Sequence, residues 1–241
     1  MTASSGTAAF GTLFVWNNYP VAELTMIGGP HSSGEKIDIT SHDSSNAYRE
    51  YVLGFLTPGS FEIEGNFIPT DTNGQAALIS DHYSTTTRSA LICFPSGIGT
   101  FSFSGWIEAF SVAAPVGDKL AFRATITTSG KPTMITTAST GLTTPFFALR
   151  DNGANAVTPS PAAAAATYWY EATLDAADTA IAIQPTATAG TIRVNGTAVT
   201  TGNWSSDITV SSGGSKLLVV TVQETNKTVK VYRIWVSRPA S

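Results

Sequence analysis

Two carboxylates in the sequence have a spacing that acid–base chemistry uses. Glu62 and Glu64 alternate along the segment FEIEGNF, which places both side chains on one face of a strand, about 7 Å apart. Paired carboxylates at about that separation serve as acid and base in glycosidases. The neighbouring positions on that face are small or carry amides, and Phe61 and Phe67 lie on the opposite face. The pattern therefore favours a solvated acidic face over a hydrolytic site.

The remaining candidates for chemistry are three histidines, one cysteine and one short polar run. His31, His42 and His82 have no spacing that would place two metal ligands on one element, which favours ordinary surface polarity. Ser41-His42-Asp43 has the residue types of a catalytic triad, but adjacent residues of an extended segment point to alternate sides. The single Cys93 excludes an intrachain disulfide. The sequence thus predicts no catalytic residue, no metal and no cofactor.

The composition is typical of an all-β protein with hydroxyl-rich faces. Charged residues make up 12% of the 241 residues, against about 25% in average globular domains. Apolar runs long enough for a transmembrane helix are absent from the sequence, and the N-terminus lacks the pattern of a secretory signal, so we expect an intracellular origin. Residues 1 to 134 carry a net charge of −5 and the rest +1. Specific nucleic-acid binding would require a basic patch instead.

Three segments of the first half alternate between apolar and polar residues, as half-buried strands do. They cover Phe61 to Phe67, Phe101 to Phe110 and Lys119 to Thr127. In the second of them the alternation is expected to slip at Gly105, where a glycine favours a β-bulge. These strands predict a β-sandwich or barrel in the first half of the chain.

Two other features of the first half stand apart from these strands. Thr72 and Gln75 fit a capping box, which predicts a helix over about 72–83 whose apolar stripe ends at Tyr83. Residues 41–59 form a long segment with aromatic and apolar side chains, which we expect to be a loop that orders on a neighbouring subunit. The alternative is a plain edge hairpin that covers the core.

The second half predicts a separate β-sandwich. Lys131-Pro132, followed by a small and polar run, places the domain boundary at a linker of residues 135–140, between domains 1–134 and 141–241. Short alternating segments separated by Gly, Ser and Asn turns predict strands near 168–174, 180–184, 191–194, 207–210, 216–223 and 228–236. Asn195-Gly196 predicts a hairpin turn. The fold class is therefore all-β, with one short α-helix in the first domain and an immunoglobulin-like sandwich in the second.

Four passages of the first half, taken in order, resemble the tail tube (major tail) proteins of long-tailed, non-contractile bacteriophages. They are SHDS at 41–44 followed by YREY, the strand FEIEGNF, the helix start DTNGQAAL, and the passage from APVGDKL to SGKP. The resemblance covers residues 35–134. In the second half, VNG at 194–196 and the closing KVYRIWVSR are similar to bacterial immunoglobulin-like or cadherin-like modules.

The tail tube resemblance implies a structural virion protein that is no enzyme. Its subunits would form hexameric rings that stack into a tube, assembled in the host cytoplasm, through which DNA is ejected without specific binding. Tape measure, tail terminator and distal tail proteins would be partners, and no membrane insertion is expected. The polar faces of the alternating strands would line the lumen, and Arg123 would pair with a glutamate. The residues expected to face the lumen are Glu62, Glu64, Asn66, Ser102, Ser104, Arg123, Thr125 and Thr127.

The family's long loop reaches the next ring, and here it maps onto residues 41–59. The residues expected in this contact are His42, Asp43, Tyr48, Arg49, Glu50, Tyr51 and Leu53. The C-terminal sandwich is expected to decorate the exterior of the tube and to be dispensable for assembly. The alternative function is a cell-surface or secreted adhesin built of immunoglobulin-like modules, which would carry a signal sequence and remain monomeric.

Overall fold

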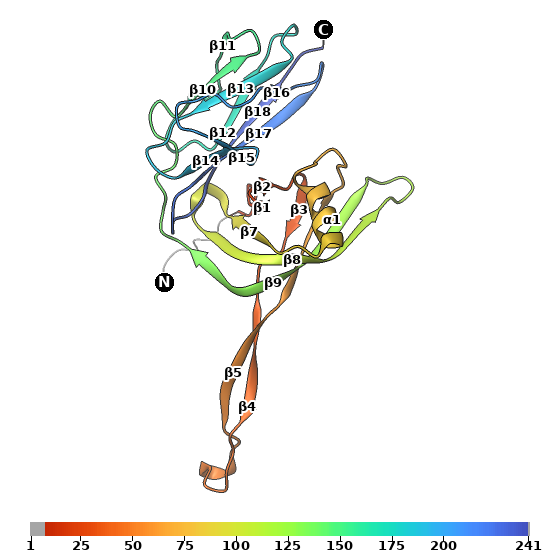
Figure 1. Ribbon diagram of the computed structural model, residues 1–241, viewed down its shortest axis with the longest axis vertical. Coiled ribbons are helices and arrows are strands. Elements are labelled where there is room, and N and C mark those ends of the chain that lie inside the picture. The colour runs from red at the N-terminus through yellow and green to blue at the C-terminus, as the bar shows by residue number, and fades with distance from the viewer. Residues whose placement is uncertain (1–7, 241) are drawn as a thin grey trace. The chain divides into compact units, whose positions relative to one another are not determined.

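The structure is a computed structural model that describes residues 8–240, so the first seven residues of the predicted N-terminal domain lie outside it. Strands dominate the described part, and α1 (Gln75–Ser84) is its one α-helix. This confirms the all-β prediction. The chain forms two compact units (Figure 1). The first comprises the residues up to Val21, Leu91–Ser102 and Met134–Ser241, and the second comprises Ala22–Ala90 and Phe103–Thr133.

A curved antiparallel sheet forms the body of the second unit (Figure 1). Its hydrogen-bonded order is β8-β9-β6-β3, from β8 (Thr100–Ala113), β9 (Ala121–Ile135), β6 (Ser60–Asn66) and β3 (Leu24–Ile27). Phe61 and Ile63 of β6, and Phe122 and Ala124 of β9, are buried. The residues between them are partly or fully exposed. One face of the sheet therefore holds the core, and the other is polar.

The glycine in β8 does not interrupt the alternation, so the slip predicted at Gly105 is wrong. Phe103, Gly105 and Ile107 are buried in turn, and Trp106 between them is exposed. A Cβ atom on Gly105 would lie 2.7 Å from the backbone oxygen of Thr127. The glycine is required because β9 approaches closely on the buried face.

The start of α1 is fixed differently from the predicted capping box, and the helix begins at Gln75 rather than near Thr72. The carboxylate of Asp71 accepts hydrogen bonds from the amides of Gly74 (3.2 Å) and Gln75 (3.0 Å). The buried Gln75 side chain donates to the backbone oxygens of Ala22 and Asn66, at 2.9 Å each. The Asp71 cap is local and could have been read from the sequence, whereas the contact of Gln75 with Ala22, 53 residues away, could not.

Two further details of α1 and its surroundings differ from the predicted apolar stripe. Tyr83, expected to close the stripe, is 81% exposed. Asp81 is instead the buried residue of the last turn, and its carboxylate forms a bidentate pair with Arg88, with contacts of 2.8 to 3.1 Å. That hydrogen-bonded pair raises the pKa of Arg88. The end of the helix is thus fixed by a charged pair.

Residues 32–58 form a two-stranded hairpin that projects from the curved sheet (Figure 1). Its strands are β4 (Ser32–Asp38) and β5 (Tyr51–Pro58). The prediction of a loop over 41–59 is therefore wrong for its second half, which is strand. The alternative is right in predicting a hairpin but wrong in placing it over the core, because every residue of β4 and six of the eight in β5 are exposed.

The C-terminal part of the first unit is a sandwich of two sheets. The four-stranded sheet has the order β11-β10-β13-β16, and the five-stranded sheet has the order β12-β18-β17-β14-β15. Their inner faces share one core, in which Leu149 and Ile183 lie with Leu218 and Ile234. The strands are β10 (Phe147–Asp151), β11 (Ala156–Val157), β12 (Trp169–Thr173), β13 (Ala180–Pro185), β14 (Thr191–Val194), β15 (Thr197–Val199), β16 (Ile208–Thr209), β17 (Ser215–Gln223) and β18 (Lys230–Ser237).

All six strands predicted for this half are present, together with β10, β11 and β15. Asn195 and Gly196 have positive φ angles of 47° and 87° and close the β14–β15 hairpin, as predicted. The first unit also contains β1 (Leu13–Trp16) and β2 (Tyr19–Pro20), which pair with each other, and the end of β7 (Arg88–Cys93), the neighbour of β1. The breaker expected at Lys131-Pro132 does not end β9, because the φ of proline suits an extended strand.

Candidate functional site

The polar face of β6 and β9 brings together most of the residues predicted to line a channel. Glu62 lies opposite Thr125 and Glu64 opposite Arg123 in the strand register. The Arg123 guanidinium is 3.6 Å from the Glu62 carboxylate and also forms an ion pair with Glu64. Arg123 was expected to pair with one glutamate, and it contacts both carboxylates.

A second polar cluster on this face was missed by the sequence analysis. The hydroxyl oxygens of Ser60 and Thr127 lie 2.7 Å apart, and both hydroxyls donate to the carboxylate of Glu108. The hydrogen bonds from Thr127 and then Ser60 lower the pKa of Glu108. Because Ser104, Trp106 and Glu108 alternate on β8, unbroken alternation would have predicted Glu108 on this face.

Two of the predicted wall residues lie at the margins of the face. Asn66, at the end of β6, donates from its side-chain amide to Glu23 at 2.9 Å. Ser104 is exposed on β8. Ser102 belongs to the first unit, where it lines a polar cavity. The structure therefore groups the wall residues of β6 and β9, and Ser102 has different surroundings.

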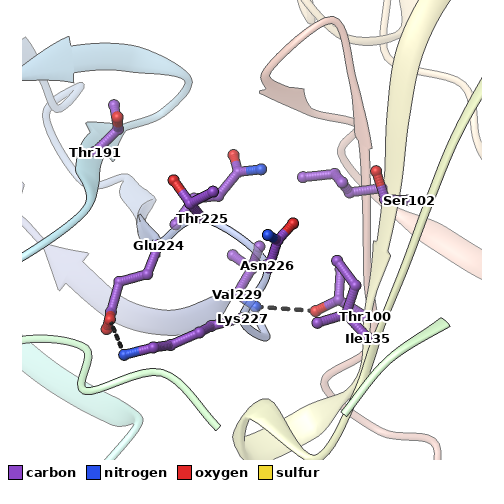
Figure 2. A pocket seen from close by; sticks show the side chains of 11 residues that line it. Thr100, Ser102, Ile135, Thr191, Glu224, Thr225, Asn226, Lys227 and Val229 are labelled. Atoms are coloured by element: carbon purple, nitrogen blue, oxygen red, sulfur yellow. Dashed lines mark hydrogen bonds and ion pairs between the residues drawn. The ribbon is translucent and has the colours of Figure 1, made fainter. Parts of the chain in front are cut away.

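The cavity that Ser102 lines has a volume of about 380 Å³ (Figure 2). Its charged residues, Glu224 and Lys227, contact each other at 2.5 Å, and Thr100 accepts a hydrogen bond from the amide of Val229 at 2.9 Å. Both contacts are drawn in Figure 2. Glu224, Lys227 and Thr100 are thus engaged in contacts within the chain. The residues around it are Leu91, Thr100, Ser102, Ile135, Thr191, Gln223, Glu224, Thr225, Asn226, Lys227 and Val229.

The β4–β5 hairpin, which we call the arm, carries large apolar side chains without a cover. Leu53 is 68% and Phe55 86% exposed. Tyr51 and Leu53 pair with Asp38 and Lys36 across the strands, and cross-strand partners project to the same side. Exposed apolar groups gathered in this way are typical of protein interaction sites.

The tip of the arm is organised by its own polar residues. Among the residues predicted here, Tyr48 is 75% exposed, and Arg49 pairs with Asp38 at 3.5 Å. Glu50 accepts a hydrogen bond from Ser44 at 3.1 Å, and its amide donates to Thr40 at 2.9 Å. His42 and Asp43 lie at the turn itself and are exposed. The seven predicted arm residues thus lie at the tip and along the adjoining part of β5.

The histidines lie apart from one another in the fold. His31 precedes β4, His42 lies at the tip of the arm, and the ring of His82 in α1 is hydrogen-bonded to the backbone oxygen of Ile107 at 3.0 Å. Within residues 8–240, no group of three His, Cys, Asp or Glu side chains is placed to hold a metal ion. The helices of this part of the chain are also too short or too polar to span a bilayer.

The class that these features define is an all-β structural protein. The family model of the lambda phage tail tube protein matches residues 4–135, and a cadherin-like β-sandwich model matches residues 154–239. Since the first match covers more than half of the chain, the chain belongs to the lambda phage tail tube protein family. It is a component of the phage virion tail.

Several solved structures are similar to part of the chain at low identity. A chain of the virion of a native gene transfer agent particle covers 54% of this chain and 98% of its own, with 16% identity and a TM-score of 0.46. A chain of the tail of an empty gene transfer agent particle covers 47% of this chain and 83% of its own, with 19% identity and a TM-score of 0.40. The SPP1 tail tube covers 51% of this chain and 74% of its own, with 12% identity and a TM-score of 0.34. Our assignment rests on the family model and not on these likenesses. None of the curated proteins matches the chain.

Proposed function

We propose that this protein forms hexameric rings that stack into the tail tube of a long-tailed phage with a non-contractile tail, and that DNA passes through the tube during ejection. The observation that carries the proposal is the polar face of β6, β8 and β9, in a chain that belongs to the tail tube family. In the proposed ring, each subunit contributes this face to a continuous inner wall.

The charges of the face suit a channel that does not hold DNA. Glu62, Glu64 and Glu108 outnumber Arg123, and that one cation is already paired. Phosphate binding requires basic groups that displace counterions. A wall with a net negative charge and hydroxyl groups would repel the phosphates and let the duplex slide. The proposed wall residues are those predicted above except Ser102, with Ser60, Trp106 and Glu108 added on the same face.

The arm is the proposed contact between subunits. Burial of Leu53 and Phe55 on a neighbouring ring would remove apolar surface from water, at about 25 cal/mol per Å². The partners proposed beyond the ring itself are the tape measure, tail terminator and distal tail proteins. We propose no enzymatic activity, since Glu62 and Glu64, the two carboxylates with glycosidase-like spacing, are both bound to Arg123. The domain boundary stays as predicted, with the linker at residues 135–140.

Electron microscopy of the purified protein tests the proposal directly. Regular tubes with a central channel and six subunits per ring are the expected result after concentration. Persistent monomers, or rings with another number of subunits, would contradict it. A second measurement is the affinity of assembled tubes for duplex DNA at low salt, where we expect no binding. The control variant Arg123→Glu should still show no DNA binding. The double variant Glu62→Lys with Glu64→Lys should bind duplex DNA measurably, with an affinity that falls as salt rises.

A further inference from the structure

The outer face of the five-stranded sheet carries a patch of apolar residues that a sandwich does not need for its own core. Val219 of β17 and Val231 of β18 are 7% and 6% exposed. Their neighbours in sequence, such as Leu218 and Tyr232, fill the inner core. Residues that alternate with core positions normally face water and are polar. Something must therefore cover these valines.

Their cover comes from the N-terminal strands of the same compact unit. Leu13 and Val15 of β1, 7% and 4% exposed, form one cluster with Cys93 of β7 and with Val219 and Val231. Burial raises the pKa of the Cys93 thiol to about 12. The contact is apolar, and each partner would expose an apolar surface without the other.

Polar contacts fix the same docking in one geometry. The Arg233 guanidinium, on the outer face of β18, donates to the backbone oxygen of Gly11 at 2.7 Å, and its burial lowers its pKa. A buried guanidinium is costly unless its donors have partners. The amide of Val229 donates to Thr100 at 2.9 Å. Charge and hydrogen bonding thus make this contact specific as well as apolar.

The connecting segment, residues 137–142, is hydrogen-bonded to the sandwich at several positions. The Glu224 carboxylate accepts hydrogen bonds from the amides of Thr140 (2.5 Å) and Gly141 (3.4 Å). The amide of Thr228 donates to Thr137 at 2.8 Å, and the amide of Leu142 donates to the Tyr232 hydroxyl at 3.0 Å. A free linker would leave these backbone groups to water.

We infer that the outer face of the five-stranded sheet is a docking surface for β1 and the end of β7, and that the sandwich and these strands unfold as one. The C-terminal sandwich is then a required part of the folded subunit. This reverses the expectation that it is a dispensable decoration. The inference concerns the single subunit, so it stands or falls independently of ring formation.

Hydrogen exchange on the full, unassembled chain tests the inference with the variant L13A/V15A. Both side chains lie on β1, outside the inner core of the sandwich. We expect exchange of the Leu218, Val220 and Ile234 amides to accelerate about tenfold or more, together with that of the β1 amides. The matched control is L24A/M26A on β3 in the second unit, which should leave exchange in β17 and β18 unchanged.

Unchanged protection in β17 and β18 of L13A/V15A, with faster exchange in β1, would overturn the inference. If the double variant fails to fold, the milder Leu13→Val gives the same comparison. Guanidinium unfolding of the unaltered chain is the second measurement. We expect β1, β7 and the sandwich to lose protection at one midpoint, and two separate midpoints for these elements would also overturn the inference.

Discussion

The arm and the outer face of the five-stranded sheet differ in whether their apolar side chains are covered. Both are strand surfaces that carry apolar side chains outside a domain core. On the sheet, Val219 and Val231 are covered by β1 and β7 of the same chain. On the arm, Leu53 and Phe55 have no cover. The difference separates a surface that completes the subunit from one that is available to another subunit.

The largest expected effect is on tube formation, from a substitution in the arm alone. Leu53→Asp places a charge in the proposed contact between subunits, and we expect complete loss of tubes, because an unpaired buried charge is strongly unfavourable. The unfolding free energy of the subunit should change by less than about 0.5 kcal/mol, since the site is exposed. Sedimentation and thermal unfolding measure the two quantities. Tubes that form normally would show that this side chain lies outside the contact.

The next effect concerns the connecting segment, residues 137–142, where it packs against β18. Gly141 has a φ of +75°, and a Cβ atom there would lie 2.6 Å from Lys230 Cδ and against the Tyr232 hydroxyl. We expect Gly141→Ala to lower the unfolding free energy by about 2–3 kcal/mol. Gly202→Ala is the control, because its φ is +74° with open space around it, and should cost about 1 kcal/mol. Equal losses in urea unfolding would argue against close packing at Gly141.

Acid should weaken the contact between Glu224 and the connecting segment. The hydrogen bond from Lys227, and then those from the Thr140 and Gly141 amides, hold the pKa of Glu224 below its ordinary 4.5. A lowered folded pKa contributes stability that is full above the ordinary value and is lost as pH falls through the folded value. Glu224→Gln should therefore cost about 1–2 kcal/mol at neutral pH and flatten the acid limb of a stability curve. A parallel curve for the variant would contradict this role.

The smallest effect concerns the ion pair at the tip of the arm. Arg49 and Asp38 lie 3.5 Å apart with side chains that are 74% and 43% exposed. Exposed pairs contribute little, so Arg49→Ala should change the unfolding free energy by less than about 0.5 kcal/mol. The pKa of Asp38 is lowered mainly by its hydrogen bonds to Thr40, with Arg49 the smallest cause. A larger loss in thermal unfolding would show that the tip is coupled to the rest of the arm.

Sequence patterns predicted the features that depend on neighbouring residues. The alternation of Phe61, Glu62, Ile63 and Glu64 placed the polar face correctly, and Asn195-Gly196 placed its hairpin. Glu108 was missed because Gly105 was taken as a break in the pattern. A strand's two faces follow from period two alone, so one wrong break moves every later side chain to the other face.

Features that depend on distant partners could not be predicted in this way. The cap of α1 by Asp71 involves Ala22 of another segment, and the sequence favoured the local pair at Thr72. The docking of β1 joins Leu13 and Val15 to residues more than two hundred positions later. Apolar residues in alternation predict that a face will be buried, but they do not say which element buries it.

The buried Cys93 provides a chemical probe of how often the docked face opens. The thiolate is the reactive form of cysteine, and burial holds this thiol protonated at neutral pH, with its pKa raised to about 12. Since the chain has one cysteine, the rate at which an alkylating reagent adds to the protein reports how often β7 separates from the sandwich. Mass spectrometry of the alkylated protein would therefore measure the rate of this opening without any engineered cysteine, both in solution and in a growing tube.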